Sequence, residues 1–415
     1  MVCYVIERHI TPSLLRALED SPVVLLHGAR QTGKSTLAQW IAKGPRPARY
    51  LTFDDAAVLA AARSDPTSFI ANLPKDVVLD EVQRAPELFM TVKAAVDRDR
   101  RPGRFLLTGS TNILLLPRLS ESLAGRMEIL SLWPLSQGEI ERTHDRFVDA
   151  VFHKTPPALA DPGATLRKLA ERIVRGGYPA VLERTSPASR RGWFGSYITS
   201  ILQRDVRDLA QIERLTELPH LLALVAARTG TLLNLAELSR SSGIPKTTLI
   251  RYLGLLETTF LVHMVPAWSA NLSKRLVKSP KVMINDTGLA ADLLHFGADR
   301  LITNPSWMGP LLETFAAAEL RKQLGWSRVQ PGMYHFRTQD GQEVDLVLED
   351  SSGRIVGIEV KATAALGAHD FRGLRALAEA TGKRFQRGIV LYAGEHAVAF
   401  GPSLHAVPMS NIWRL

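Results

Sequence analysis

Short apolar runs alternate with helix-like stretches in the first third of the chain. Residues 23–26, 77–79 and 105–107 are uninterrupted apolar runs, and the segments between them read as helices. Continuous apolar runs are typical of strands buried on both faces, and their alternation with helices is typical of βαβ units. The first third is therefore predicted to be an α/β region with a mostly parallel sheet.

The pattern changes twice further along the chain. Residues 193–209 and 218–227 have the spacing of helices, which predicts a helical middle region. Strands are predicted over residues 343–348 and 355–360, and a helix over residues 371–380. The last third therefore returns to a mixed α/β pattern.

Two loop-like segments divide these regions. Residues 153–163 (HKTPPALADPG) contain proline-based turns and are interpreted as a linker, while residues 303–310 form a weaker boundary rich in Asn, Pro, Ser and Gly. Three domains are predicted, with the following limits: 1–150, α/β; 151–305, helical, with a helix-turn-helix at about 229–268; and 306–415, α/β.

The basic excess of the chain is concentrated in its middle. The chain has 51 Lys and Arg against 41 Asp and Glu, a net charge of +10. Residues 1–150 contribute +1, residues 151–310 contribute +8 and residues 311–415 contribute +1. Such an excess suits a polyanionic partner, nucleic acid or an anionic membrane face, without choosing between them.

Cysteine content and hydropathy exclude several classes of protein. Cys3 is the single cysteine of the sequence, which excludes an internal disulfide and a cysteine-based zinc cluster, and a cytoplasmic location is expected. No apolar run approaches the ~18 residues of a membrane span. The first ten residues, MVCYVIERHI, do not have the pattern of a secretory signal. No membrane partner is expected.

A phosphate-binding loop is predicted at residues 28–35. The segment GARQTGKS fits G-x-x-x-x-G-K-[S/T] and lies between an apolar run and a helix-like stretch. In such loops backbone N–H groups bind phosphate oxygens, the lysine reaches the β- and γ-phosphates and the hydroxyl binds Mg²⁺. The alternative is a glycine-rich turn with a solvated lysine. The residues predicted to bind ATP are Gly28, Ala29, Arg30, Gln31, Thr32, Gly33, Lys34, Ser35 and Thr36.

Two further strand ends supply candidate catalytic groups. VVLDE ends in Asp80, predicted to hold Mg²⁺ together with Ser35, and Glu81, predicted to activate the attacking water. The alternative is a pair of helix-capping acids. The next strand, RFLLTGSTN, offers Ser110 and Asn112 near the γ-phosphate. Arg126 is a candidate to reach a phosphate, with a plain surface arginine as the alternative.

These motifs together resemble an AAA+-type ATPase. The runs YLTFDD, VVLDEVQR, LLTGST and LAGRMEILSLWPLSQGE are similar to those of the predicted bacterial and archaeal ATPases that carry a conserved C-terminal domain of unknown function. The resemblance implies an extra strand near residues 51–53, between the P-loop strand and the strand of Asp80. It also implies ATP and Mg²⁺ as cofactors, and because ATPases of this class commonly work as oligomers, it is compatible with a homo-oligomer. We find no clear sensor 2 arginine.

A helix-turn-helix is predicted inside the basic middle region. A helix over residues 235–242 ends at Gly243, Pro245 begins the next helix, and a strand-like stretch over residues 260–266 would form a wing. The start of the second helix of such a motif enters the major groove of DNA. Protein–protein modules and rigid helix pairs share this pattern and remain alternatives. The predicted DNA contacts are Lys246, Thr247, Thr248 and Arg251, with Lys274, Arg275, Lys278 and Lys281 extending the basic face.

The last third contains a pattern of acids that resembles the PD-(D/E)xK nuclease fold. Asp345 and the pair Glu359 and Lys361 lie on predicted strands, and Glu313 lies on a preceding helix. In that fold the acids hold Mg²⁺ and the lysine assists the attacking water. A strand-borne E-x-K is common by itself, and many proteins with this fold have lost cleavage.

Three functions are compatible with these motifs. The first is an enzyme that hydrolyses ATP with Mg²⁺ and couples hydrolysis to DNA binding or remodelling. The second is a nucleotide-regulated DNA-binding switch with slow hydrolysis, and the third is a nucleotide-gated, metal-dependent nuclease.

Overall fold

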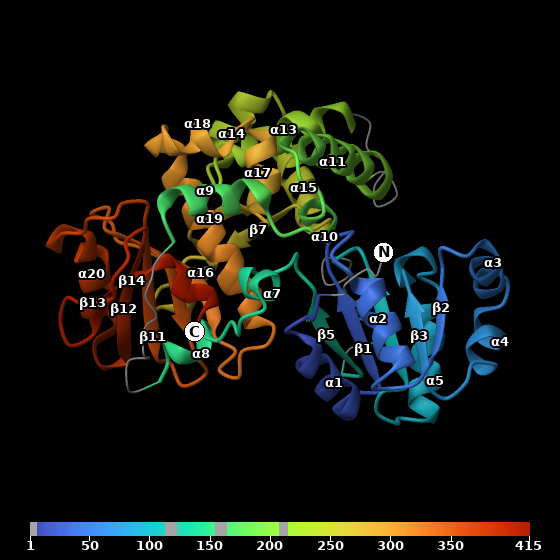
Figure 1. Ribbon diagram of the computed structural model, residues 1–415. Helices are drawn as coiled ribbons and strands as arrows, with labels where there is room; N and C mark the ends of the chain where they lie inside the picture. Colours follow the sequence, from blue (N-terminus) through green and yellow to red (C-terminus); the bar gives the residue numbers. More distant parts are fainter. Residues whose placement is uncertain (1–5, 113–122, 124, 154–163, 207–214) are drawn as a thin grey trace. The chain divides into compact units, whose positions relative to one another are not determined.

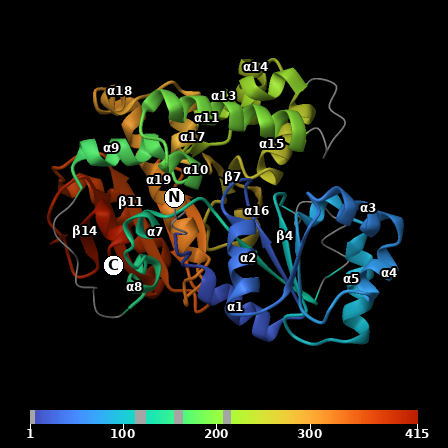
Figure 2. The same cartoon turned by 45° about the vertical axis from the view of Figure 1, so that its right-hand side comes forward.

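The computed structural model divides the chain into two compact units (Figures 1 and 2). It describes residues 6–112, 123, 125–153, 164–206 and 215–415, the side chains of residues 204 and 215 excepted. The first unit holds residues 1–135 and 257–260, and the second holds residues 136–256 and 261–415. The first unit thus ends before the predicted limit at residue 150, and the predicted second and third domains cluster together. The predicted linker lies, except for His153, outside the described residues.

The first unit contains a five-stranded parallel sheet. The predicted apolar strands are confirmed, and each strand is extended by one or two polar residues or glycines at its carboxyl end. The strands are β1 (Val23–His27), β2 (Arg49–Thr52), β3 (Val77–Asp80), β4 (Phe105–Gly109) and β5 (Met127–Ser131). Their order in the sheet is β2-β3-β4-β1-β5.

The position of β2 corrects one prediction. β2 lies at the edge of the sheet, and β4 is the strand between the P-loop strand β1 and β3, which carries Asp80. The burial of the two strands gives the physical reason. All five residues of β4 are buried, whereas Arg49 on β2 is exposed and the other three residues of β2 are half-buried. A strand with exposed polar positions suits an edge, and a wholly buried one suits the centre.

Helices cover this sheet and complete its core. Figure 1 shows α2 in front of the strands. Phe53, Phe89 and Phe105 lie in one buried cluster with the apolar faces of the neighbouring helices. The helices are α1 (Thr11–Asp20), α2 (Lys34–Lys43), α3 (Ala56–Ser64), α4 (Pro66–Ala71) and α5 (Leu88–Arg98).

The second unit is helical in its first half. The helix predicted from residue 193 is α11, which ends at Ser200 and is followed by a π-helix over Ile201–Val206; its predicted last residues lie outside the described part. The main helices of the unit before residue 325 are α9 (Leu166–Arg175), α11 (Pro187–Ser200), α13 (Leu218–Ala226), α14 (Leu235–Ser242), α15 (Lys246–Thr258), α17 (Thr287–Leu293) and α19 (Pro305–Leu324). Shorter helices are α7 (Gln137–Glu141), α8 (Phe147–Ala150), α10 (Pro179–Leu182), α16 (Leu272–Val277) and α18 (Ala298–Ile302).

The loop predicted over residues 303–310 is wrong from residue 305 onward. Pro305 occupies the first turn of α19, where its missing N–H has no cost, and Pro310 is accommodated inside the helix. Met308, Leu311 and Leu312 are buried. Burial of these side chains outweighs the poor helix propensity of the Gly-Pro pair.

Two sheets complete the second unit. A three-stranded antiparallel sheet has the order β6-β8-β7, and a six-stranded mixed sheet has the order β13-β14-β12-β11-β10-β9. Helix α20 (Arg372–Thr381) packs against the central strands of the larger sheet. The strands are β6 (Thr231–Leu232), β7 (Val262–Val265), β8 (Lys281–Ile284), β9 (Gly332–Arg337), β10 (Glu343–Glu349), β11 (Ile355–Lys361), β12 (Phe385–Tyr392), β13 (Val398–Ala399) and β14 (Leu404–Pro408).

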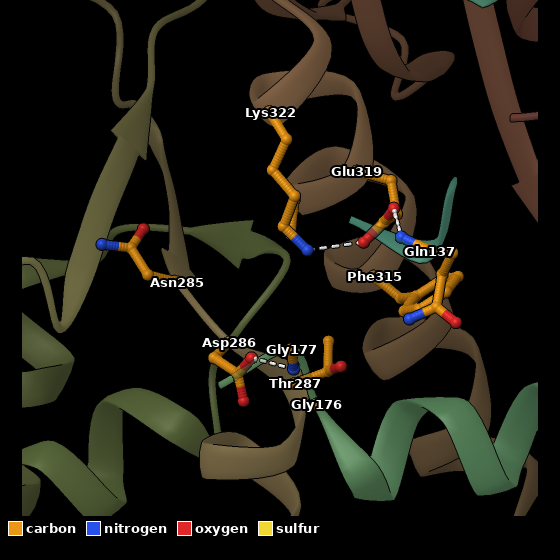
Figure 3. Close-up of a pocket in the computed structure, with 10 residues that line it drawn as sticks. Gln137, Gly176, Gly177, Asn285, Asp286, Thr287, Phe315, Glu319 and Lys322 are labelled. Carbon is orange, nitrogen blue, oxygen red and sulfur yellow. Dashed lines mark hydrogen bonds and ion pairs between the residues drawn. The ribbon is translucent and has the colours of Figure 1, made fainter. Parts of the chain in front are cut away.

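A buried polar network surrounds a small pocket lined by α19, α7 and the segment before α17 (Figure 3). Lys322 donates to Glu319 at 2.5 Å, and the Glu319 carboxylate also accepts the Gln137 N–H at 2.7 Å. Asp286 accepts the Gly177 N–H at 2.8 Å. Burial raises the pKa of Glu319, and the Lys322 ammonium opposes that shift. These contacts satisfy charges that would otherwise be costly to bury, so we assign the network a structural role.

None of the helices among the described residues has the length and hydropathy needed to cross a membrane.

Candidate functional site: a phosphate-binding loop with a paired serine and aspartate

The loop between β1 and α2 adopts a conformation that its glycines permit. Gly33, just before α2, has φ 95°, in the left-handed region. At Gly28, which also has a positive φ, an added Cβ would collide with the carbonyl oxygen of Leu132. Both positions therefore exclude larger residues. Arg8 supports the loop by donating to the carbonyl oxygens of Thr32 at 2.6 Å and Trp133 at 2.7 Å.

Lys34 lies inside this loop. Its side chain is only 4% exposed, and its ammonium donates to the carbonyl oxygens of Gly28 at 3.0 Å and Ala29 at 2.8 Å. These contacts hold a buried positive charge next to the loop, at the start of α2, where backbone N–H groups are unpaired. The arrangement suits the binding of an anion.

Ser35 and Asp80 meet at the adjacent strand end. The Ser35 hydroxyl donates to Asp80 Oδ1 at 2.9 Å. Asp80 also accepts hydrogen bonds from Tyr50 at 2.6 Å, Thr52 at 3.3 Å and Thr108. Burial and the hydrogen bond to Asp80 raise the pKa of Tyr50, so this phenol stays a donor. A carboxylate held by hydroxyl groups beside a serine is an oxygen-rich set of the kind that Mg²⁺ prefers.

Glu81 follows Asp80 in a left-handed conformation, with φ 60°. Its N–H donates to the Thr108 hydroxyl at 3.1 Å, and its carboxylate accepts from the Gln83 amide. The same amide donates to the Ser110 hydroxyl at 2.8 Å. Gln83 thus connects Glu81 to Ser110, two residues predicted to share a site.

Five supporting residues were missed in the sequence: Arg8, Tyr50, Thr52, Gln83 and Thr108. For Thr52 and Thr108, which lie on strands, the sequence contains a signal that could have identified them. Thr52 pairs with Asp80 across neighbouring parallel strands, and Thr108 lies on the next strand. Hydroxyls at the carboxyl ends of adjacent parallel strands can be expected to meet. No comparable signal exists for Arg8, which contacts residues 24 and 125 positions away.

Arg126 lies apart from this cluster, and Asn112 contacts a different segment. Arg126 precedes β5, whose first residue pairs with Val23, while the loop follows the other end of β1. About 13 Å of strand separates the two ends, and Arg126 contacts Asp97 Oδ1 at 2.5 Å. Arg126 therefore does not face the loop of its own chain. The Asn112 N–H donates to the Thr258 carbonyl at 2.8 Å, and no described contact joins Asn112 to Glu81.

The two helices predicted for the helix-turn-helix are present in the structure. Helix α14 ends at Gly243, which has φ 70°, and α15 begins at Lys246. The predicted apolar face of α15 is buried through Leu249, Leu253 and Leu256. At the start of α15, Lys246, Thr247 and Arg251 are exposed and Thr248 is half-buried.

The predicted extension of this basic face is wrong for two of its four residues. Lys274 and Lys278 are exposed. Arg275 instead donates to Glu349, with an Nη2–Oε1 distance of 3.1 Å, and its guanidinium lies over the ring of Trp268. Lys281 is buried, with 1% of its side chain exposed. Both side chains neutralise acids inside the second unit, so part of the +8 charge of the middle region is internal.

The four residues of the predicted nuclease-like site do come together. Asp345 Oδ2 accepts the Val360 N–H at 2.9 Å, and Lys361 donates to Glu359 at 2.7 Å. Lys281 joins them, with its ammonium 2.7 Å from Glu313 and 3.3 Å from Asp345. Burial, followed by repulsion from Asp345, raises the pKa of Glu313, and the same two causes raise the pKa of Glu359 to about 8. Burial alone would lower the pKa of Lys281, but the surrounding carboxylates outweigh it and raise this pKa.

Comparison with known families agrees with this geometry. Residues 20–141 match the model of an AAA domain. Residues 166–300 and 308–412 match two domains of unknown function, DUF8612 and DUF4143. The parallel sheet, the phosphate-binding loop and the AAA match define the first unit as an AAA-type ATPase domain.

Relatives extend along the whole chain. Rv2008c of Mycobacterium tuberculosis and Mb2031c of Mycobacterium bovis are each 34% identical to it over 420 residues, covering 99% of this chain and 85% of the relative. The chain belongs to their family, and in this chain an AAA domain precedes a C-terminal DUF4143 domain.

Solved structures of low similarity also match, among them the following two. A RuvB mutant of Thermotoga maritima is 18% identical, covers 62% of this chain and 89% of its own, and has a TM-score of 0.25. AMPPCP-bound DnaA of Aquifex aeolicus is 16% identical, covers 59% and 86%, and has the same TM-score. A score of 0.25 is too low to define a shared fold, so the class of the first unit rests on its family match and strand order.

Proposed function

We propose that the chain binds ATP with Mg²⁺ at residues 28–36 and hydrolyses it. The contact between the Ser35 hydroxyl and Asp80, beside the buried ammonium of Lys34, carries the proposal. Bound Mg²⁺ would neutralise charge on the β- and γ-phosphates. Ser35 would supply an oxygen ligand to the metal, and Asp80, which accepts the Ser35 hydrogen bond, would help to hold it.

The remaining residues have distinct roles in this proposal. The Lys34 ammonium leaves the loop carbonyls and binds the terminal phosphates. Glu81 accepts the proton of the attacking water as general base. Gln83 holds the Glu81 carboxylate and the Ser110 hydroxyl at one place, so it is a positioning residue. Arg126 can contribute only to the nucleotide of another chain, which would require a homo-oligomer.

Weakened magnesium binding is the direct test of the Ser35–Asp80 contact. In Ser35→Ala the concentration of Mg²⁺ needed for half-maximal phosphate release should rise by about 10- to 100-fold, because one metal ligand is lost. EDTA should abolish phosphate release by the wild type. Ser64→Ala, an exposed serine at the end of α3, is the matched control and should behave as wild type. An unchanged Mg²⁺ requirement in Ser35→Ala would place the metal elsewhere.

We further propose that α14, α15 and the β6-β8-β7 sheet form a winged helix that binds DNA. The exposed start of α15 supports this proposal, because Lys246, Thr247 and Arg251 face solvent while the leucine face is buried. This is the surface that a recognition helix presents to the major groove. The ATPase could then act as a motor, or its nucleotide state could control DNA affinity with slow turnover.

Salt dependence of DNA affinity tests the winged helix. Duplex binding measured by fluorescence anisotropy should weaken in Lys246→Ala and in Arg251→Ala. If both residues contact phosphates, each variant should lower the slope of log affinity against log salt by about 1. Lys383→Ala, an exposed lysine far along the chain, is the control. Affinity that differs between ATP and ADP would favour the switch, and DNA-stimulated hydrolysis would favour the motor. If the wild type and the three variants gave equal slopes of log affinity against log salt, this surface would not be the DNA-binding site.

We also propose that the six-stranded sheet and α19 form a PD-(D/E)xK-like fold. The support is geometric: β10 and β11 bring Asp345, Glu359 and Lys361 together, and α19 adds Glu313. A shared fold does not by itself imply cleavage. Whether the site can hold a metal depends on the position of Lys281.

A further inference from the structure

A buried lysine lies at the centre of the acidic cluster of the second unit. Lys281 begins β8, and its ammonium is 2.7 Å from Glu313 Oε1, 2.6 Å from Glu343 Oε1 and 3.3 Å from Asp345 Oδ1. An ammonium has three N–H donors, so these three carboxylates are enough to use them all. Lys281 thus occupies the point on which the three acids converge.

The backbone of Lys281 is held in a central strand. It pairs with Leu232 of β6 on one side and with Val265 of β7 on the other. The side chain therefore reaches the carboxylates from a fixed origin, and it can leave them only by rotation within a site where 1% of it is exposed. If the Lys281 side chain left these carboxylates, its buried ammonium would lose its partners, which is strongly unfavourable.

The acids around Lys281 are the oxygen ligands that a divalent cation would use. Mn²⁺ and Mg²⁺ bind carboxylate oxygens at about 2.1 Å, whereas the ammonium lies at hydrogen-bond distance from the same oxygens. A metal ion and the Lys281 ammonium cannot both occupy this point, because two positive charges a few ångströms apart in a poorly solvated site repel each other strongly. Within the described residues, no group of three or more His, Cys, Asp or Glu side chains is arranged to hold a metal ion as the side chains stand, so metal binding here would also require these carboxylates to reposition.

One member of the cluster retains an unused acceptor. Glu359 Oε1 accepts from Lys361 at 2.7 Å, while Glu359 Oε2 is buried without a hydrogen-bond partner among the described residues. A buried carboxylate oxygen in this state is costly unless a cation or proton reaches it. Glu359 Oε2 is therefore an oxygen that could still act as a ligand beside the position that Lys281 fills.

We propose that the Lys281 ammonium replaces a divalent cation in this cluster, so that the site binds metal only when Lys281 is removed or withdrawn. The C-terminal domain then carries carboxylates that could act as metal ligands, together with an internal cation that occupies their place. This inference is independent of ATP hydrolysis at residues 28–36, because it concerns a different unit of the chain.

Metal binding by nucleotide-free, full-length protein tests the proposal. Mn²⁺ binding is followed by the EPR signal of free Mn²⁺, and stability by thermal melting. The wild type should bind no Mn²⁺ at the cluster. Lys281→Met should gain one site per chain, with affinity raised on the order of 100-fold because the repelling charge is gone. Mn²⁺ should raise the Tm of this variant and leave that of the wild type unchanged.

Controls assign the new site to the cluster. Lys278→Met, three residues earlier and exposed, should gain nothing. Adding Asp345→Asn to Lys281→Met should remove the gained Mn²⁺ site, and Lys281→Arg should keep the site closed. A folded Lys281→Met protein that binds no Mn²⁺ would overturn the proposal.

The wild type decides the question even if Lys281→Met does not fold. Stoichiometric Mn²⁺ binding by the wild type that is lost in Asp345→Asn would show that metal and Lys281 coexist, and the proposal would fail. Absence of Mn²⁺ binding in both proteins would support it.

Discussion

Replacing Glu81 by Gln should lower the rate of ATP hydrolysis by about 10²- to 10⁴-fold while leaving ATP affinity nearly unchanged. Glutamine keeps the shape of the side chain and its contact with Gln83, but it cannot accept the proton of the attacking water. Asp80, Ser35 and Lys34 remain to bind nucleotide and metal. Single-turnover phosphate release and binding of a fluorescent ATP analogue measure the two effects separately.

A second Glu→Gln substitution is the matched control, because it also removes one negative charge. Glu128 is exposed on β5 and pairs in register with Val24, well before the loop. Glu128→Gln should therefore hydrolyse ATP at the wild-type rate. If Glu81→Gln kept full activity, another group would be the general base, and Glu81 would be left with a structural role at the end of β3.

Loss of Lys34 should affect binding as well as turnover. Lys34→Ala removes the buried ammonium that lies against the loop carbonyls, which takes away the charge expected on the β- and γ-phosphates. Hydrolysis should fall by about 10²- to 10³-fold, as for other groups that stabilise charge in a transition state. The Kd for the ATP analogue should rise, unlike in Glu81→Gln.

The control for this variant lies on the same helix. Lys43 is exposed in the last turn of α2, so Lys43→Ala removes an equal charge without touching the loop. Its melting temperature and ATPase rate should match the wild type. Wild-type hydrolysis by a folded Lys34→Ala protein would show that ATP is hydrolysed at a different site.

Local pattern was sufficient to predict three buried strands of the first unit and to locate the loop between β1 and α2. Val23, Val77 and Phe105 each open an apolar run that is a buried strand in the structure, because continuous apolar runs have few other uses in a short segment. Gly33 and Lys34 were recognisable for a similar reason, since the backbone geometry of the loop admits few residue types.

Properties that depend on distant neighbours were not predictable in this way. The order of strands depends on how crossovers pack, so β2 was placed between β1 and β3 when it lies at the edge. Lys281 was assigned to an exposed basic face because a lysine in a basic region is usually solvated. Its three partners lie 32, 62 and 64 residues further on, and only the folded chain brings them to it.

Backbone pairing between the two sheets of the second unit has a consequence for truncation. The Trp268 N–H donates to the His335 carbonyl at 2.6 Å, and the His335 N–H donates to the Pro266 carbonyl at 2.9 Å. A cut near residue 305, between the two domains of unknown function, would sever both bonds and separate Lys281 from its acids. Each fragment cut at those family limits would have a strand edge without its hydrogen-bond partners. Lys281 in one fragment and its acids in the other would lose their ion pairs. We therefore expect the segment that carries β6, β7 and β8 and the C-terminal sheet to depend on each other, so that a recombination exchanging one without the other would destabilise both.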